Sequence, residues 1–405
     1  MRLLVVSHNY PRFPGDPAGG YVARLARAAH SAGAAVWVVA PHTAGTAYED
    51  TDDGVPVRRF GYAPEPLERI GYRGDVRSRA LLSPLSLLVL PLYLAAFTRA
   101  VRRAVAELDP NVVHAHWWFP AGWVVARARG GGRGGAGGER PFVLTCHGSD
   151  VRLLDRRVLV PRLARPVFDH AAAITTVSRF LAADIERHAL RLKRPVMVAP
   201  MPLEVDRFAA GTTTPKAQPP RILYAGNLVA SKGVDVLLRA FQILRQRGIP
   251  CRVRVLGEGP ERRNLEVLAR QLGIADAVDW SNFVRQDAMP AEYGSSTITV
   301  LPTRGHAEGL GLALVEALLS GSAVVGTPAG GIPEIVVDGE TGLLARDGDP
   351  RHLADQLGRL LSDPALRARL TAEGARRMQA MYSPTVAADR FLALYDAIAL
   401  DHPER

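Results

Sequence analysis

The residues best suited to chemistry lie between His306 and Ala317, directly after an apolar run that ends at Leu301. A strand that leads through a glycine-containing turn into an apolar helix places free backbone N–H groups and the positive end of the helix dipole at the carboxyl edge of a parallel sheet. Such a helix start attracts anions such as phosphate. The segment therefore predicts an anion site at Gly309, Leu310 and Gly311.

Two carboxylates flank this helix start. Glu308 lies in the turn, and Glu316 follows eight residues later, on a similar face of the helix. In these positions they suit hydrogen bonds from the hydroxyl groups of a sugar on one side and of a ribose on the other. By itself the pattern favours a plainer interpretation, in which one glutamate caps the helix and the other is solvated.

A second segment, Gly226 to Gly233, also follows a strand-like run and should reach the same kind of sheet edge. Lys232 is placed there to neutralise a diphosphate, and Asn227 precedes it in the turn. A solvated lysine at a helix end is the plain alternative. Because two such segments occur in one half of the chain, each strengthens the functional interpretation of the other.

The size and composition of the chain are those of a globular enzyme. A chain of 405 residues exceeds the size of one growing core, which predicts two domains. A content of 47% hydrophobic and 22% charged residues argues against a disordered or fibrous protein. The net charge of +10 indicates attraction to anions: nucleic acid, acidic lipid or phosphorylated substrates. Without zinc-finger spacing or an aromatic-basic RNA pattern, we expect no nucleic-acid partner.

Cys146 and Cys251 lie in separate apolar runs without metal-ligand spacing, so neither a disulfide nor a metal site is expected from them. The first residues, Met1 to Val6, pass directly into a strand-like run that is too short for the apolar part of a signal peptide. We therefore expect a cytoplasmic protein.

Strand-like runs alternate with helical patterns along the chain, which predicts βαβ units and parallel sheets. In the first half we expect a helix at Gly19–Ala32 and strands at Leu3–Ser7, Ala35–Ala40, Val112–Ala115, Phe142–Cys146, Ala173–Val177 and Val196–Ala199. In the second half we expect strands at Arg221–Tyr224, Arg252–Leu256, Val278–Trp280, Ile298–Leu301 and Ala323–Gly326. The Thr- and Pro-rich segment Ala209–Pro220 suits a linker, and a last helix, Pro384–Leu400, is long enough to return to the first domain.

Two segments depart from this alternation. Arg129–Gly138 is glycine-rich but lacks the Gly-Lys-Ser/Thr ending of a phosphate-binding loop, so a surface loop is expected. Ala80–Phe97 is apolar, with arginines on both sides, but its length and its prolines, Pro84 and Pro91, argue against a membrane span. It suits either core helices or a surface that enters the membrane interface with arginines on the headgroups.

Taken together, the motifs resemble those of the family-4 glycosyltransferases, a large retaining group with the two-domain fold called GT-B. The matching residues, in chain order, are Gly19-Gly20, His147-Gly148-Ser149-Asp150, Val177-Ser178, Lys232-Gly233, Gly257-Glu258-Gly259-Pro260, Glu308 with Glu316, Gly330-Gly331-Ile332-Pro333-Glu334 and Asp338-Gly339-Glu340-Thr341-Gly342. Each motif is weak alone, but their order along most of the chain is specific.

The resemblance implies a role for each of the residues in the second half. Glu308 would hold hydroxyl groups of the sugar, and Gly309 to Gly311 would present backbone amides to the sugar and phosphate. Lys232 would bind the diphosphate, and Glu316 the ribose. No metal would be required.

In the first half the resemblance implies that Gly20 approaches the diphosphate or the acceptor and that His147 contacts the transferred sugar. His147, Glu308 and Lys232 are thus the expected catalytic residues. The chain departs from the family at Asn227, where similar proteins usually have arginine. Either Asn227 donates neutral hydrogen bonds to the diphosphate, or an arginine from elsewhere, such as Arg304 or Arg12, replaces the missing cation.

Three motifs suggest other chemistry. Asp50-Thr51-Asp52-Asp53 contains the Asp-x-Asp of metal-dependent glycosyltransferases, but its polar surroundings favour a solvated turn. Gly257-x-Gly259 follows a strand like a dinucleotide fingerprint, yet Arg262 stands at the third glycine. His114 and His116 could suggest a metal, but we expect their rings on opposite faces of a strand, in the core or at the acceptor.

The sequence therefore predicts two doubly wound, Rossmann-like domains facing a cleft, with the acceptor on residues 1–205 plus 384–405 and the nucleotide sugar on residues 206–383. The expected activity is retaining transfer of a sugar to a hydroxyl group of a glycan, a lipid-linked or a small-molecule acceptor, without a cofactor. The alternatives are an epimerase or hydrolase of the same fold and an inactive scaffold. An anionic membrane surface is a further expected partner, at the inner face of the cell membrane.

Overall fold

The computed structural model describes residues 1–16, 18–68, 70, 72, 84–129, 140–155, 159–188, 192–282 and 284–401. The chain forms two compact units, Met1–Leu203 with Pro384–Arg405, and Glu204–Ser383. Each unit is built on its own sheet of mainly parallel strands, with helices between them in the sequence. The predicted fold class, two α/β units that are each built on a mainly parallel sheet, is confirmed.

The sheet of the first unit has the strand order β3-β4-β2-β1-β5-β6-β7-β8, and only β3 runs antiparallel to its neighbour. Its strands are β1 (Arg2–Val6), β2 (Ala35–Pro41), β3 (Glu49–Asp52), β4 (Val55–Phe60), β5 (Val112–His116), β6 (Phe142–Cys146), β7 (Ala173–Thr176) and β8 (Val196–Val198). Every residue of β5 and β6 is buried. Uninterrupted apolar runs are typical of such strands, because helices cover both faces of a parallel sheet.

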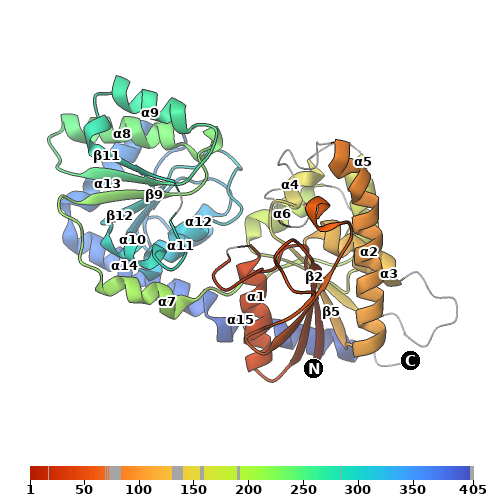
Figure 1. Cartoon of the computed structure of the whole chain (residues 1–405). Helices are drawn as coiled ribbons and strands as arrows, with labels where there is room; N and C mark the ends of the chain where they lie inside the picture. Colours follow the sequence, from red (N-terminus) through yellow and green to blue (C-terminus); the bar gives the residue numbers. More distant parts are fainter. Residues whose placement is uncertain are drawn as a thin grey trace. The chain divides into compact units, whose positions relative to one another are not determined.

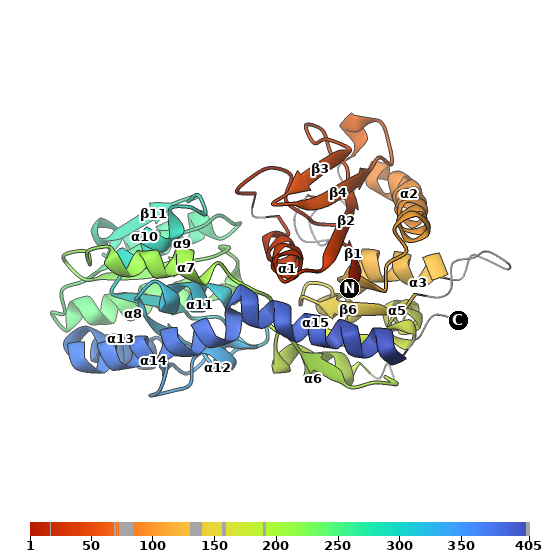
Figure 2. The same ribbon diagram turned by 90° about the horizontal axis from the view of Figure 1, so that it is seen from below.

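The helices of the first unit lie on the two faces of this sheet. Figure 1 shows α1 (Gly20–Ser31) on one face and α2 (Pro84–Leu108) with α3 (Trp123–Arg129) on the other. The long helix α15 (Pro384–Asp401), drawn in full in Figure 2, packs against α1 and β5. Shorter helices are α4 (Val151–Leu154), α5 (Leu159–His170) and α6 (Arg179–Arg187).

The sheet of the second unit is parallel throughout, in the order β11-β10-β9-β12-β13-β14. Its strands are β9 (Arg221–Ala225), β10 (Arg252–Leu256), β11 (Val278–Ser281), β12 (Ile298–Leu301), β13 (Ala323–Gly326) and β14 (Leu343–Leu344). The helices are α7 (Val205–Ala209), α8 (Val234–Gln246), α9 (Arg262–Gln271), α10 (Met289–Ser295), α11 (Leu312–Leu319), α12 (Ile332–Ile335), α13 (Pro350–Ser362) and α14 (Pro364–Tyr382). Figure 1 shows α8 and α9 on one side of these strands, and α10, α11 and α14 on the other.

Two expectations about local structure are wrong. Asp50 to Asp52 belong to the edge strand β3, not to a turn, because their backbone pairs with β4 although their side chains are mostly exposed. The segment Ala209–Pro220 is not a free linker. It belongs to the second unit, where Gly211 is buried and lies so close to the carbonyl oxygen of Pro290 that a Cβ would be 2.4 Å from it.

The apolar stretch predicted at Ala80–Phe97 is helix α2 from Pro84 onward, while residues 80–83 lie outside the described residues, as do residues 130–138 of the glycine-rich segment. Among its described side chains, α2 buries Val89, Tyr93, Phe97 and Val101, each four residues from the next, toward the sheet. In the described part of the chain, no helix combines the length and the apolar character needed to cross a bilayer.

Candidate functional site

Lys232 and Glu308 meet at one edge of the second unit's sheet. Lys232 ends a short 3-10 turn after β9, and Glu308 lies in the loop between β12 and α11. Nζ of Lys232 is 2.5 Å from Oε2 of Glu308, and the two side chains are 17% and 16% exposed. The pair is therefore largely shielded but still open to a ligand.

The two turns adjoin because β9 and β12 are parallel neighbours, so their carboxyl ends reach the same edge of the sheet. The N–H of Arg304 donates to the carbonyl oxygen of Ser231 at 2.8 Å. Gly233 has a φ of 68°, and a Cβ there would lie 2.0 Å from the carbonyl oxygen of Pro302. Only glycine allows this approach, which sets the position of Lys232 beside the loop.

The loop of Glu308 is held on its other side by Gly330 and Gly331. The N–H of Gly331 donates to the carbonyl oxygen of Glu308 at 3.1 Å. Gly330 has a φ of 56°, and a Cβ there would lie 1.7 Å from the same oxygen. These contacts give a physical reason for the Gly-Gly motif. They place Gly309, Leu310 and Gly311 directly before α11, where Gly311 is the N-cap residue.

Glu316 lies within α11 and accepts a hydrogen bond of 2.9 Å from the hydroxyl group of Tyr293 on α10. Burial and the Glu316 carboxylate raise the pKa of Tyr293, so its phenol remains a donor. Tyr224 similarly donates to the carbonyl oxygen of Asn227 at 2.9 Å, and burial followed by Glu308 raises its pKa. Neither tyrosine could be predicted as a site residue from the sequence, because neither carries a local signal beyond strand or helix composition.

The arginines suggested as replacements for a cation at Asn227 both pair with carboxylates of their own units. Nη2 of Arg304 is 2.6 Å from Asp235, and Nε of Arg12 is 2.7 Å from Asp16 in the first unit. The side chain of Asn227 itself is exposed. Among the ion pairs of the described residues, Glu308 pairs with Lys232.

In the first unit, His147 follows β6 and lies among aromatic rings. Its ring centroid is 4.5 Å from that of Trp117 and 4.9 Å from that of Tyr21, the residue next to Gly20 at the start of α1. Its Nε2 atom is 3.0 Å from Nδ1 of His116. Burial lowers the pKa of both histidines well below the usual value, so both rings are neutral near pH 7.

His114 and His116 lie on one face of β5, with ring centroids 4.1 Å apart. The expectation of opposite faces is wrong, because residues i and i+2 of a strand share a face. The two nitrogens of His114 are engaged at 2.6 Å by the hydroxyl groups of Tyr395 and Thr145. Burial lowers the pKa of His114 to about 3. This histidine has a core role and joins β5 to α15.

Asp150 holds the loop that carries His147. Its Oδ1 atom accepts the N–H groups of His147 and Gly148, both at 3.0 Å, and its Oδ2 atom accepts that of Trp118 at 3.1 Å. The buried indoles Trp117 and Trp118 donate to Ser149 and to the carbonyl oxygen of Asp150. Both indoles therefore pack in the core of the first unit.

Two carboxylates of the Asp50–Asp53 segment are engaged by other side chains of the chain. Asp52 accepts a hydrogen bond of 2.7 Å from Tyr10, and Asp53 pairs with Arg27 at 2.8 Å. Within the described ranges, no group of three histidine, cysteine or acidic residues is arranged to hold a metal ion.

Comparison with known proteins identifies the family. Residues 18–207 match the model of Glycosyltransferase Family 4, and residues 209–377 match that of Glycosyl transferases group 1. D-inositol 3-phosphate glycosyltransferase of Acidothermus cellulolyticus is 31% identical over 355 residues, which cover 78% of this chain and 75% of that protein. Alpha-D-kanosaminyltransferase of Streptomyces kanamyceticus is 32% identical over 181 residues, 45% of this chain and 46% of that protein.

Solved structures show the same fold. Sucrose-phosphate synthase from Thermosynechococcus elongatus has a TM-score of 0.77 at 21% identity, covering 99% of both chains. Anabaena HepE, solved in complex with UDP-glucose, has a TM-score of 0.69 at 17% identity, covering 98% of this chain and all of that one. The chain thus belongs to the family-4, group 1 glycosyltransferases, which depend on nucleotide sugars, and it has their GT-B fold.

Proposed function

We propose that this chain is a retaining, metal-independent glycosyltransferase whose second unit binds the nucleotide-diphosphate sugar and whose first unit binds the acceptor. The observation that carries the proposal is the meeting of Lys232 with Glu308 beside the start of α11. An ammonium group and a helix N-terminus there provide two sources of positive potential for a diphosphate.

In the proposed reaction, the bond between the anomeric carbon and the diphosphate oxygen breaks, and a bond forms between that carbon and an acceptor hydroxyl oxygen. The acceptor proton passes to a phosphate oxygen of the departing nucleoside diphosphate. Negative charge develops on that leaving group, so positive donors already in place are the largest stabilising contribution available. Lys232 and the backbone amides of Gly309 to Gly311 would supply them without a metal ion.

Glu308 has two functions in this proposal. Its carboxylate keeps the Lys232 ammonium in place, at 2.5 Å, and it accepts hydrogen bonds from sugar hydroxyl groups. Glu316, oriented by Tyr293, would accept those of the ribose. His147 would contact the transferred sugar with a neutral ring, and Gly20 would approach the diphosphate or the acceptor. Asn227 would donate neutral hydrogen bonds where related proteins have arginine.

The relatives' names describe transfer to inositol 3-phosphate and transfer of a kanosaminyl group. The first name supports a small hydroxylated acceptor for this chain; a glycan and a lipid-linked acceptor are the alternatives that the same experiment tests. A panel of nucleotide sugars is screened first for thermal stabilisation of the protein, because a bound donor raises the apparent stability. Release of nucleoside diphosphate is then measured with each acceptor, in the presence of EDTA.

We expect release only with an acceptor, unaffected by EDTA, and a product with the anomeric configuration of the donor, determined by NMR. Lys232→Met should lower kcat/KM by about 100- to 1,000-fold, as does the loss of one donor to an oxyanion. Lys193→Met, at an exposed lysine of the first unit, is the matched control and should retain full activity. Conversion of the donor without an acceptor would favour an epimerase or hydrolase, and donor binding without any conversion would favour an inactive scaffold.

A further inference from the structure

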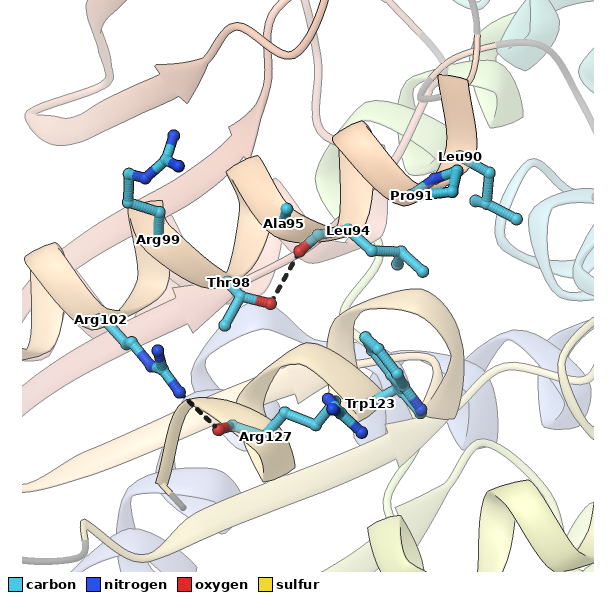
Figure 3. Close-up of a pocket in the computed structure, with 9 residues that line it drawn as sticks. All are labelled: Leu90, Pro91, Leu94, Ala95, Thr98, Arg99, Arg102, Trp123 and Arg127. Carbon is cyan, nitrogen blue, oxygen red and sulfur yellow. Dashed lines mark hydrogen bonds between the residues drawn. The ribbon is translucent and has the colours of Figure 1, made fainter. Parts of the chain in front are cut away.

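A surface groove of about 870 Å³ lies on the first unit, between α2 and α3. Figure 3 shows its two walls. The wall on α2 is apolar at Leu90, Pro91 and Leu94. One and two turns further along the helix it is cationic, at Arg99 and Arg102. The opposite wall is formed by Trp123 and Arg127 of α3. The groove therefore combines an apolar end with a cationic one, and the function proposed above uses none of these residues.

The outer stripe of α2 also changes from apolar to cationic residues along the helix. Leu88, Leu92, Ala95, Arg99 and Arg102 are all exposed, and they follow one another at intervals of four and three residues. This spacing places them on one face of the helix, opposite the residues that α2 buries. Leu88 and Leu92 are 73% and 58% exposed, and together with the apolar end of the groove they form one apolar patch beside the arginines.

The cations of the groove are available to an outside anion. Nη2 of Arg102 donates to the carbonyl oxygen of Arg127 at 3.2 Å, and the guanidinium group of Arg127 lies 4.7 Å from the ring centroid of Trp123. Glu107, the acidic residue of α2, instead pairs with Arg58 and Arg103. In the part of the chain that the structure describes, Arg99, Arg102 and Arg127 form no ion pair with a carboxylate.

The separation between leucines and arginines matches a lipid interface. Arg99 follows Leu92 by seven residues, which is about 10 Å along the axis at a rise of 1.5 Å per residue. When the axis of α2 points toward the bilayer with its leucine end lowest, this axial separation becomes a difference in depth, and it is comparable to the roughly 5–10 Å to which interfacial apolar groups are buried. Arginines at the other end would then lie at the level of the lipid phosphates.

We propose that this face, defined as the outer stripe of α2 with the α2–α3 groove, docks on a membrane that contains anionic phospholipids. Leu88 and Leu92 enter the acyl region, and Arg99, Arg102 and Arg127 bind the phosphates. This inference goes beyond the proposed transfer reaction and does not depend on it, because binding to the membrane is measured without a nucleotide sugar.

The experiment is co-sedimentation of the full chain with vesicles of phosphatidylcholine alone or mixed with phosphatidylglycerol. We expect binding to the mixed vesicles, and release at high salt. Each arginine at an anionic surface contributes about fivefold to binding, so R99E/R102E/R127E should weaken it by at least about 100-fold. L88S/L92S leaves the charge unchanged and should weaken it by about tenfold or more. Circular dichroism and thermal unfolding verify that both variants fold.

The matched control is R239E/R270E/R351E, which reverses three exposed arginines of the second unit and should bind the vesicles like the parent chain. The proposal fails if the parent chain ignores anionic vesicles, or if the control loses as much binding as the groove variant. It also fails if glycerol 3-phosphate in solution binds the groove as tightly as vesicles do. Finally, it fails if L88S/L92S converts a lipid-free dimer into a monomer, since a second copy of the chain would then cover this face.

Discussion

The close approach of Gly330 to Glu308 makes Gly330→Ala an informative substitution. A Cβ at this position would lie 1.7 Å from the carbonyl oxygen of Glu308, 2.7 Å from its carbonyl carbon and 3.2 Å from its Cα. All three atoms belong to the backbone, so no change of side-chain rotamer can relieve the overlap. The loop that carries Glu308 must move, and with it the contact to Lys232.

Gly339, in the same unit, is a reference for the loss of folding free energy that Gly330→Ala should cause. Gly330 and Gly339 have φ angles of 56° and 74°, but nothing lies within 4 Å of a Cβ at Gly339. In both variants alanine in the left-handed region costs about 1–2 kcal/mol, partly offset by about 0.4–1 kcal/mol from the less flexible unfolded chain. The overlap at Gly330 adds about 1–3 kcal/mol. Gly330→Ala should therefore be less stable than Gly339→Ala by that amount.

Urea denaturation measures this difference directly, and thermal unfolding should show about 2–4 °C for each kcal/mol in a domain of this size. Transfer activity should separate the variants further, because a displacement of about 1 Å in a catalytic loop can lower the rate about 100-fold. Gly339→Ala should stay close to the parent rate. Equal stability and equal turnover of the two variants would refute the claim that Gly330 shapes the Glu308 loop.

Three further predictions concern single side chains. Tyr395→Phe removes the 2.6 Å hydrogen bond to the buried His114 and should lower the free energy of unfolding by about 1–3 kcal/mol; unchanged urea denaturation would contradict it. Burial lowers the pKa of His8 from 6.5 to about 4. Between these two pH values the His8 ring is protonated in the unfolded chain and neutral in the folded chain, so a falling pH favours unfolding. The resulting loss of about 3 kcal/mol in the free energy of unfolding should shrink in His8→Phe, measured by urea denaturation across the same pH range. Asn227→Arg adds a cation to the turn that ends at Lys232 and should tighten donor binding about fivefold by calorimetry, the upper range for a partly exposed charge pair; unchanged affinity would place Asn227 away from the diphosphate.

Most strands of the two sheets, though not β3, β4 and β14, and the turns at their carboxyl ends could be predicted from the sequence. The predicted bounds of β6, β10, β12 and β13 agree with the structure. Strands such as β12 and β13 are buried throughout and consist almost entirely of apolar residues, whereas in β10 two half-buried arginines alternate with buried valines. The same logic located Lys232 and Glu308, since the carboxyl ends of parallel strands are where ligands bind. The family followed from the order of these turns along the chain.

Which side chains meet depends on the three-dimensional fold. Lys232 and Glu308 are 76 residues apart, and Gly330 closes on Glu308 from a third turn; no local pattern encodes such contacts. The edge strand β3 exists because its backbone pairs with β4, although its own side chains are polar. Likewise, the sequence showed that Ala80–Phe97 is apolar, but packing on the sheet chose which face of α2 is buried. That choice leaves Leu88, Leu92 and Arg99 exposed on one stripe, because a helix can turn only one side toward the core.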